Sequence, residues 1–200
     1  THMKYLLSLS NFDESKWKVL PNGVDNSRFA SVSSDDIDPN LVVYISSPDR
    51  GLHLLLNAWP MILTRNPNVK LRIAYNIDSW YEAMSTAEHS WDPGIREISH
   101  RASYVMNTLT RLSGKCDVQH LKSISYNEMT KLLSTAAVMA YPCDPIRFTE
   151  GFSCSLMEAC ASNTGVVTTN VDSLEELYGN WLVQVDAVNE DNLEKFADKV

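Results

Sequence analysis

The sequence predicts an α/β fold, a Rossmann-like doubly wound parallel sheet. Two observations carry this prediction: short, mainly apolar runs alternate with segments of helical spacing, and the clearest of these runs, LVVYIS and AAVMAY, contain almost no polar residues. Strands of a parallel sheet are buried on both faces, so their sequences are apolar throughout. Because crossovers between parallel strands are right-handed, the alternation places helices on both faces of one sheet.

The first half of the sheet begins with the apolar run LVVYIS at Leu41. Apolar side chains then recur at helical spacing over residues 52–63, which predicts a helix packed on the sheet, with a bend at Pro60. The run KLRIAY is the second expected strand. A long polar insertion follows it, and the next helix is expected over residues 95–112.

The second half continues with the expected strands CDVQHLKSI, AAVMAY, GVVTT and WLVQV. Helices are expected over residues 126–134, after the stretch TEGFSCS, at SLEELY and at the end of the chain. Ligands of such sheets bind beyond the carboxyl ends of the strands. The loops to consider therefore follow Ile45, Tyr75, Lys122, Tyr141 and Thr169.

The pattern Ser-x-x-Glu recurs at three of the predicted helix starts. In a capping box the serine side chain accepts a hydrogen bond from one free N–H group, and the glutamate reaches back to another. The three pairs are Ser125/Glu128, Ser155/Glu158 and Ser173/Glu176. For Glu158 two interpretations have equal weight, a helix cap and a binding residue.

Composition and charge describe a globular chain, with 44% hydrophobic residues and a formal net charge of −8. A face that binds nucleic acid or an anionic membrane needs clustered cations, so no nucleic-acid partner is expected. No apolar run approaches the roughly 20 residues of a transmembrane helix, and no signal peptide is recognisable. These features lead us to expect a cytoplasmic protein.

Two further patterns predict no metal site. Asp36-Ile37-Asp38 spells Asp-x-Asp, a spacing with which some enzymes hold a metal, but it lies in an acidic stretch typical of a linker. The cysteines lack the paired spacing of a zinc site. Cys154 and Cys160 are expected to be small apolar residues that fill space in the core. The four cysteines are Cys116, Cys143, Cys154 and Cys160.

The stretch TEGFSCSLMEACASNTGVVTT places Glu150 and Glu158 eight positions apart. Glu150 lies in the loop after the fourth strand, directly before a helix whose free N–H groups attract anions. Gly151 lets the backbone approach a ligand closely. The carboxylate can accept two sugar hydroxyls, while the N–H groups of Phe152 and Ser153 stay available for phosphate or sugar oxygens. The alternative is a glutamate favoured there only by the helix dipole.

Three stretches, in order, resemble the group 1 retaining glycosyltransferases (glycosyltransferase family 4). The Glu-Gly-Phe-Ser signature with its second glutamate and Val-Val strand is similar to the donor site of these enzymes. VLPNGVDNSRF resembles the segment that links their two halves, and VYISSPDRGLHLLLNAWPMI resembles the first strand, loop and helix of the carboxyl-terminal half. The resemblance extends from Lys18 onward. It implies the GT-B architecture, in which two Rossmann-like domains close over the substrates.

The resemblance implies roles for single residues. Glu150 matches the glutamate that contacts the donor-sugar hydroxyls, and Glu158 matches the one that binds the ribose hydroxyls of the nucleotide. Arg50 lies where the family places a cation for the diphosphate leaving group, a charge that a preorganised site stabilises strongly. The loop beside Glu150 completes the donor site with Gly151, Phe152 and Ser153.

Two further basic residues have open roles. Lys122, at the end of the third strand, lies near the expected base pocket, and a surface lysine is an equally weighted alternative. Arg147 is a candidate second cation. Many relatives carry both an arginine and a lysine after the first strand, where this chain has Ser46 and Ser47 followed by Arg50 alone.

By this resemblance the chain divides into three parts. Residues 1–3 are a cloning scar. Residues 4–39 are a remnant of an amino-terminal half with the interdomain linker, and residues 40–200 are a nucleotide-sugar donor-binding Rossmann-like domain. The acceptor-binding domain is expected upstream. The fragment alone is therefore expected to bind donor and transfer sugar inefficiently, because catalysis needs both reactants in register.

The expected function is the donor-binding half of a retaining, metal-independent glycosyltransferase. A UDP-sugar is the first expectation for the donor and a GDP-sugar the second, with a glycan, lipid or protein as acceptor and no metal or other cofactor. The alternative is a degenerate, non-catalytic module that serves protein assembly. The full-length protein is expected in the cytoplasm, with the cytoplasmic face of a membrane as an alternative. An NAD enzyme is disfavoured because no G-x-G-x-x-G follows a strand.

Overall fold

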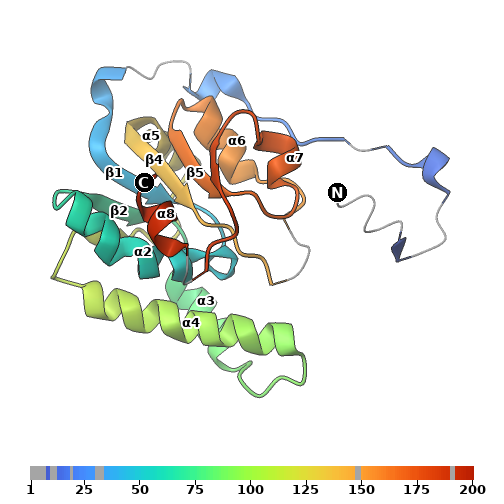
Figure 1. Ribbon diagram of the computed structural model, residues 1–200, viewed down its shortest axis with the longest axis horizontal. Helices are drawn as coiled ribbons and strands as arrows, with labels where there is room; N and C mark the ends of the chain where they lie inside the picture. Colours follow the sequence, from blue (N-terminus) through green and yellow to red (C-terminus); the bar gives the residue numbers. More distant parts are fainter. Residues whose placement is uncertain (1–7, 10–12, 19, 30–33, 147–149, 190–191) are drawn as a thin grey trace.

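Six parallel strands form one sheet in the order β3-β2-β1-β4-β5-β6 (Figure 1). The computed structural model describes residues 8–9, 13–18, 20–29, 34–146, 150–189 and 192–200. The strands are β1 (Asp38–Tyr44), β2 (Lys70–Ile73), β3 (Val118–His120), β4 (Ala136–Tyr141), β5 (Gly165–Thr169) and β6 (Val183–Val185). All five pairings are parallel, which confirms the predicted Rossmann-like sheet.

Helices cover both faces of the sheet. One face carries α2, α4 and α8, and the other carries α5, α6 and α7 (Figure 1). The helices are α2 (Leu52–Arg65), α3 (Ile77–Ser85), α4 (Pro93–Leu112), α5 (Tyr126–Thr135), α6 (Cys154–Ala161), α7 (Leu174–Tyr178) and α8 (Leu193–Ala197). Short 3-10 helices precede β1 or follow it: η1 (Glu14–Lys16), η2 (Asn26–Phe29), η3 (Ser34–Asp36) and η4 (Pro48–Arg50).

Part of the core lies between β1 and α2, as the apolar patterns predict. Val43 and Tyr44 of β1 are fully buried, and so are Leu52, Leu55 and Trp59 along one side of α2. Burying such side chains contributes about 1.5–3 kcal/mol each, so the continuous strand and the striped helix stabilise each other.

The long polar insertion contains a helix, α3, that the sequence analysis missed. Ile77 and Trp80 are its two buried anchors, and the Asn76 side chain caps it by accepting a hydrogen bond from the Ser79 N–H. Two anchors are too few to establish a helical period. The following helix, α4, also starts earlier than expected because Asp92 caps it at Pro93.

One of the three predicted capping boxes forms. The Ser125 side chain accepts from the Glu128 N–H, while the Glu128 carboxylate accepts from the Ser125 N–H. The prediction is wrong for the other two. Ser153, not Ser155, caps α6, and Ser173 makes no side-chain cap to α7. The Ser-x-x-Glu spacing lies near both helix starts, but the Ser155 and Ser173 hydroxyls donate to the carbonyl oxygens of Ile45 and Glu150 instead.

Two other expectations need correction. Cys154 and Cys160 are exposed, so they do not fill the core. Asp38 belongs to β1, and its carboxylate lies 2.7 Å from the Lys70 ammonium of β2. This pair is at the amino-terminal ends of the strands, opposite the edge at which Rossmann-like sheets bind ligands.

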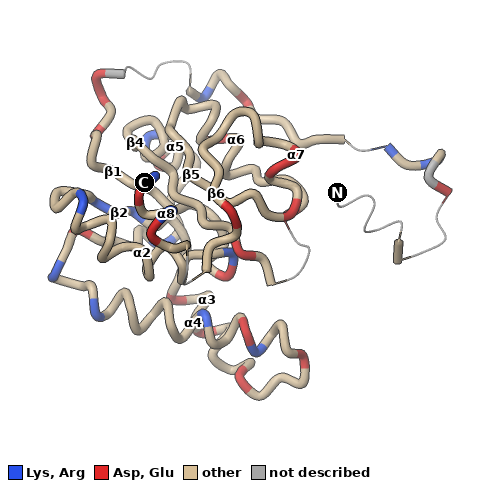
Figure 2. Tube along the Cα trace, in the orientation of Figure 1, with Lys and Arg blue, Asp and Glu red and all other residues tan. Residues whose placement is uncertain are grey.

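Charged residues are distributed over many elements in the described ranges. Figure 2 shows Lys and Arg on separate helices and loops, with Asp and Glu between them. Within the described residues, none of the helices combines the length and apolar character that crossing a bilayer requires.

Candidate functional site

The loops after β1 and β4 meet at the point where the strand order reverses. β1 and β4 are neighbours in space, but the chain leaves them in opposite directions, and ligands of doubly wound sheets bind at the carboxyl ends of strands where the order reverses in this way. Gly51 lies where the loops touch: a Cβ atom there would be 2.0 Å from the Pro142 carbonyl oxygen. Its φ of 122° also favours glycine. The Asp144 N–H donates to the Arg50 carbonyl at 3.2 Å, so the two loops form one unit.

Arg50 and Glu150 form an ion pair in this unit. The distance from Arg50 Nη1 to Glu150 Oε2 is 2.8 Å. The Glu150 side chain is only 3% exposed, and that of Arg50 is 30% exposed. Burial alone would lower the pKa of Arg50, but the adjacent Glu150 carboxylate raises it above its ordinary value. Arg50 is therefore a permanent cation, and part of its side chain reaches solvent.

Tyr141, at the end of β4, holds the same carboxylate oxygen. Its hydroxyl donates to Glu150 Oε2 at 2.6 Å. Burial raises the pKa of Tyr141 far above its ordinary value, and the nearby Cys143 and Glu150 add to this effect. The hydroxyl consequently keeps its proton and remains a donor. Sequence reasoning missed this residue, although it named the loop that follows it.

The backbone of Glu150 is held by the loop after β5. The Glu150 N–H donates to Asp172 Oδ2 at 2.9 Å, and the Ser173 hydroxyl donates to the Glu150 carbonyl oxygen. Asp172 adopts a φ of 59°, a backbone conformation uncommon outside glycine. Three loops, after β1, β4 and β5, thus position one glutamate.

The loop beside Glu150 leads into α6. Ser153 caps the helix through its side chain, and the Phe152 ring packs on Tyr178 with 6.3 Å between centroids. Among the described residues, the N–H groups of Phe152 and Ser153 have no hydrogen-bond acceptor. These free donors at the start of a helix are suited to an anionic or hydroxyl oxygen.

Glu158 forms a separate ion pair. Its Oε1 is 2.8 Å from Nη1 of Arg28, a residue of η2. The second amino group of Arg28 donates to the Thr130 hydroxyl of α5 at 3.0 Å. Glu158 therefore serves no cap, and it joins α6 to α5 and to the segment ahead of the sheet.

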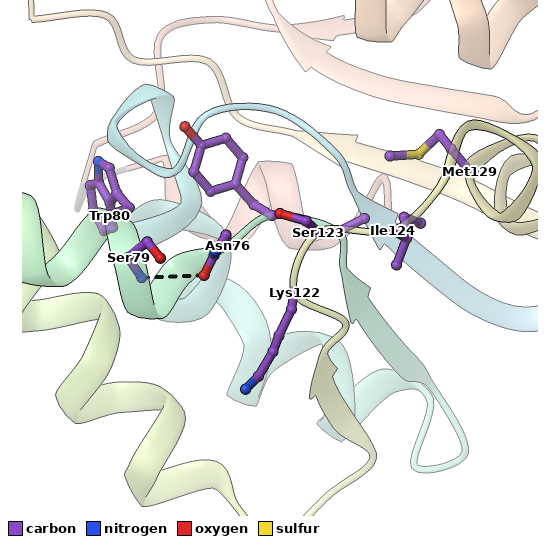
Figure 3. A pocket seen from close by; sticks show the side chains of 9 residues that line it. Asn76, Ser79, Trp80, Lys122, Ser123, Ile124 and Met129 are labelled. Carbon is purple, nitrogen blue, oxygen red and sulfur yellow. Dashed lines mark hydrogen bonds between the residues drawn. The ribbon is translucent and has the colours of Figure 1, made fainter.

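A pocket of about 470 Å³ opens at the carboxyl ends of β2 and β3. Figure 3 shows Asn76, Ser79 and Trp80 on one side of it and Ile124 and Met129 on the other. The pocket is lined by Ala74, Tyr75, Asn76, Ser79, Trp80, Lys122, Ser123, Ile124 and Met129. It combines flat apolar walls with a few polar groups, the usual character of a small-molecule site.

Lys122 lines this pocket through its stem, and its charged end lies outside. The side chain is 69% exposed, and Nζ lies 3.5 Å from the Asp78 carboxylate. Figure 3 shows it directed away from Ser123 and Met129. The residue thus borders the pocket while its ammonium lies at the surface, and its role beside a base stays a prediction.

Arg101 of α4 clamps the two loops that carry the ion pair, and sequence reasoning did not find it. Its Nη1 donates to the carbonyl oxygens of Asp49 at 2.9 Å and Asp144 at 2.7 Å. Its Nη2 lies 2.7 Å from the Asp144 carboxylate, and the side chain is 11% exposed. An arginine within a helix gives no local signal of such long-range bonds. The other candidate cation, Arg147, lies outside the described residues.

Comparisons with known proteins identify the family of the chain. The sequence model of the family described as glycosyl transferases group 1 matches residues 28–200. The chain belongs to this family. No curated protein sequence matches the chain.

Solved structures of glycosyltransferases share the fold. A glycosyltransferase from Rickettsia africae superposes with a TM-score of 0.66 at 17% identity, over 98% of this chain and 49% of that one. Anabaena HepE, in complex with UDP and glucose, gives 0.64 at 18% identity, over 91% of this chain and 46% of that one. The carboxyl-terminal domain of the group 1 protein LpcC from Francisella tularensis gives 0.57 at 16% identity, over 88% of this chain and 85% of that domain.

These matches place the group 1 chain within the GT-B architecture, as the resemblance implied. It spans about half of the Rickettsia and Anabaena chains and most of the LpcC carboxyl-terminal domain. The shared part is thus the carboxyl-terminal, Rossmann-like half of the architecture.

Proposed function

We propose that this chain is the donor-binding half of a retaining glycosyltransferase that uses a nucleotide sugar. The observation that carries the proposal is the Arg50–Glu150 pair at the strand-order reversal, beside the free N–H groups of Phe152 and Ser153. A cation, a carboxylate and N–H donors at one crevice match the charge and hydroxyl pattern of a sugar diphosphate.

The nucleoside end fits the pocket at β2 and β3. Adjacent strands lie about 4.8 Å apart, so the pocket and Glu150 are separated by about 10–14 Å along the sheet edge. An extended nucleoside diphosphate spans such a gap. The base would then lie between Trp80 and Met129, and the diphosphate would reach Arg50 at the centre of the sheet. The complex of Anabaena HepE with UDP and glucose supports UDP as the first choice, with GDP second.

In the proposed reaction Arg50 stabilises the negative charge that develops on the leaving diphosphate. Preorganised cations act most strongly where charge appears in the transition state. Arg50 supplies the positive charge that a bound metal ion supplies in other transferases, so the proposal includes no metal. Glu150 orients Arg50 through Oε2 in the free protein. Its other oxygen, Oε1, turns to the sugar hydroxyls when donor binds, which requires more exposure than the 3% seen here.

The acceptor belongs to the remainder of the enzyme. Because the chain spans about half of the Rickettsia and Anabaena chains that it matches, we assign the glycan, lipid or protein acceptor to a second domain. Transfer needs both reactants in register, so the chain alone should bind donor with little turnover. A cytoplasmic location, in solution or at a membrane face, is where nucleotide sugars would reach such a site.

Calorimetry tests this function. UDP and GDP are titrated, with EDTA present, into the wild-type chain and into Glu158→Ala. Saturable binding of one nucleotide is expected, and the substitution should weaken it about tenfold because a charge-assisted hydrogen bond is lost. Arg65→Ala is the matched control, since Arg65 pairs with Glu194 of α8 away from the site. No saturable binding by either nucleotide would instead support a non-catalytic module, an alternative favoured by the single cation after β1.

A further inference from the structure

Arg28 lies ahead of the sheet in sequence, but its side chain is enclosed by the domain. It is 12% exposed although its 3-10 helix, η2, precedes β1 in an otherwise exposed segment. The next residue, Phe29, is 6% exposed and anchors η2 to the core. The position of Arg28 is thus fixed by packing on the domain.

The guanidinium of Arg28 makes three contacts with two helices. Nη1 bonds to Glu158 of α6 at 2.8 Å, and Nη2 donates to Thr130 of α5 at 3.0 Å. The carbon at its centre lies 3.2 Å from the centroid of the Tyr126 ring, a stacked cation–π arrangement. The rigid planar fork of arginine can satisfy all three contacts together, whereas the point charge of lysine cannot.

These contacts use one of the two carboxylate oxygens of Glu158. Oε1 bonds to Arg28, whereas Oε2 has no hydrogen-bond donor among the residues that the structure describes. The side chain keeps 22% of its surface exposed. The carboxylate is therefore held in one orientation with one oxygen available to a ligand.

Helix α5 connects the Arg28 contacts to the proposed nucleoside pocket. Thr130, which shares Arg28 with Glu158, directly follows Met129, and Met129 forms a wall of that pocket. A ribose attached to a base in the pocket would meet this wall. Two adjacent hydroxyl groups are the donors that a fixed carboxylate oxygen accepts best.

We propose that Arg28 is a positioning residue that holds Glu158 in place for the ribose hydroxyls of the nucleotide. The proposal rests on the nucleotide-sugar function above. It makes nucleotide affinity depend on a residue of the segment before the domain, through the orientation of a side chain on α6. Arg28 itself touches no part of the nucleotide.

The test compares UDP with 2′,3′-dideoxy-UDP, which lacks both ribose hydroxyls, by calorimetry on the intact chain. If GDP is the nucleotide that binds, GDP and its dideoxy counterpart are used. We expect Arg28→Ala to weaken UDP binding about fivefold to tenfold and to leave dideoxy-UDP binding within about twofold. Glu158→Ala should show the same selectivity with a larger loss. The double variant should lose no more than Glu158→Ala, because the two residues act as one unit.

Two results separate the proposal from the function beneath it. If Glu158→Ala weakens UDP selectively but Arg28→Ala weakens both nucleotides equally, or neither, the positioning role is wrong and the ribose role of Glu158 stands. If wild type binds none of the nucleotides, the proposed function itself fails. Should Arg28→Ala not fold, Arg28→Lys retains the charge and loses the fork. A selective, smaller loss for UDP then supports the role, and an equal loss for both ligands overturns it.

Discussion

The two glutamates of the signature form ion pairs of the same length in different surroundings. Glu150 meets Arg50 at 2.8 Å with its side chain 3% exposed, and Glu158 meets Arg28 at 2.8 Å with its side chain 22% exposed. The first pair joins two loops of the sheet. The second joins the domain to the segment ahead of it. The distance alone therefore does not tell how much each pair stabilises the fold. The burial of the carboxylate and the segment that supplies the arginine differ between the two pairs.

Removing the arginine of each pair should give the largest difference in the free energy of unfolding between the two pairs. Arg50→Ala leaves a buried carboxylate without its cation, which costs about 3 kcal/mol in the free energy of unfolding. Arg28→Ala leaves a carboxylate that water can reach, so we expect about 1 kcal/mol. Urea denaturation of both variants measures the difference. Equal losses would show that burial does not distinguish the two pairs.

A substitution at Gly51 tests whether the Arg50–Glu150 pair depends on the contact between the loops after β1 and β4. Gly51→Ala places a Cβ 2.0 Å from the Pro142 carbonyl at a φ of 122°, so we expect a loss of about 2 kcal/mol. Gly114→Ala is the matched control, because Gly114 also has a positive φ but no atom within 4 Å of its added Cβ. A similar loss in both variants would assign the effect to backbone strain rather than to loop contact.

The hydroxyl partners of the two pairs give a smaller contrast. Tyr141→Phe removes a buried donor to Glu150 and should cost about 1.5 kcal/mol. Thr130→Val removes a half-exposed acceptor from Arg28, and we expect about 0.5 kcal/mol. Thermal and urea unfolding of the two variants provide the measurement. A larger loss for Thr130→Val would reverse the proposed ranking.

Protonation of Asp144, which lies in the loop after β4, should lower the free energy of unfolding by a modest amount. Burial raises the pKa of Asp144, but the His53 hydrogen bond and Arg101 outweigh it, so the pKa lies below its ordinary value. A depressed pKa stabilises the fold above the unfolded-state value of about 3.9 and loses that contribution as the pH falls through the folded-state value. The free energy of unfolding, followed from pH 7 to pH 2, should fall less steeply at the acid end in Asp144→Asn. An unchanged slope would contradict this role.

The sequence was sufficient for the sheet, for most helices and for bringing Arg50 and Glu150 to one edge. Those features follow from apolar patterns and from the rule that parallel strands share a carboxyl edge. The missed features depend on contacts between distant residues. The bonds of Arg101 and the pairing of Arg28 with Glu158 have no local signature. The Ser155 hydroxyl likewise donates to the distant Ile45 carbonyl oxygen instead of capping α6. Helix α3 was missed because its two anchors are too few to show a period.

The reversal of strand order also determines how the chain must assemble. Arg50 lies between β1 and α2, whereas Glu150 follows β4, so α2, β2, α3, α4, β3, α5 and β4 intervene between the two residues in the chain. The Arg50–Glu150 pair can form only when β4 has docked beside β1, a contact between segments far apart in the sequence. A break in the chain between α3 and α4 would divide the crevice between two fragments. Any ligand held there would then bind only their reassembled pair.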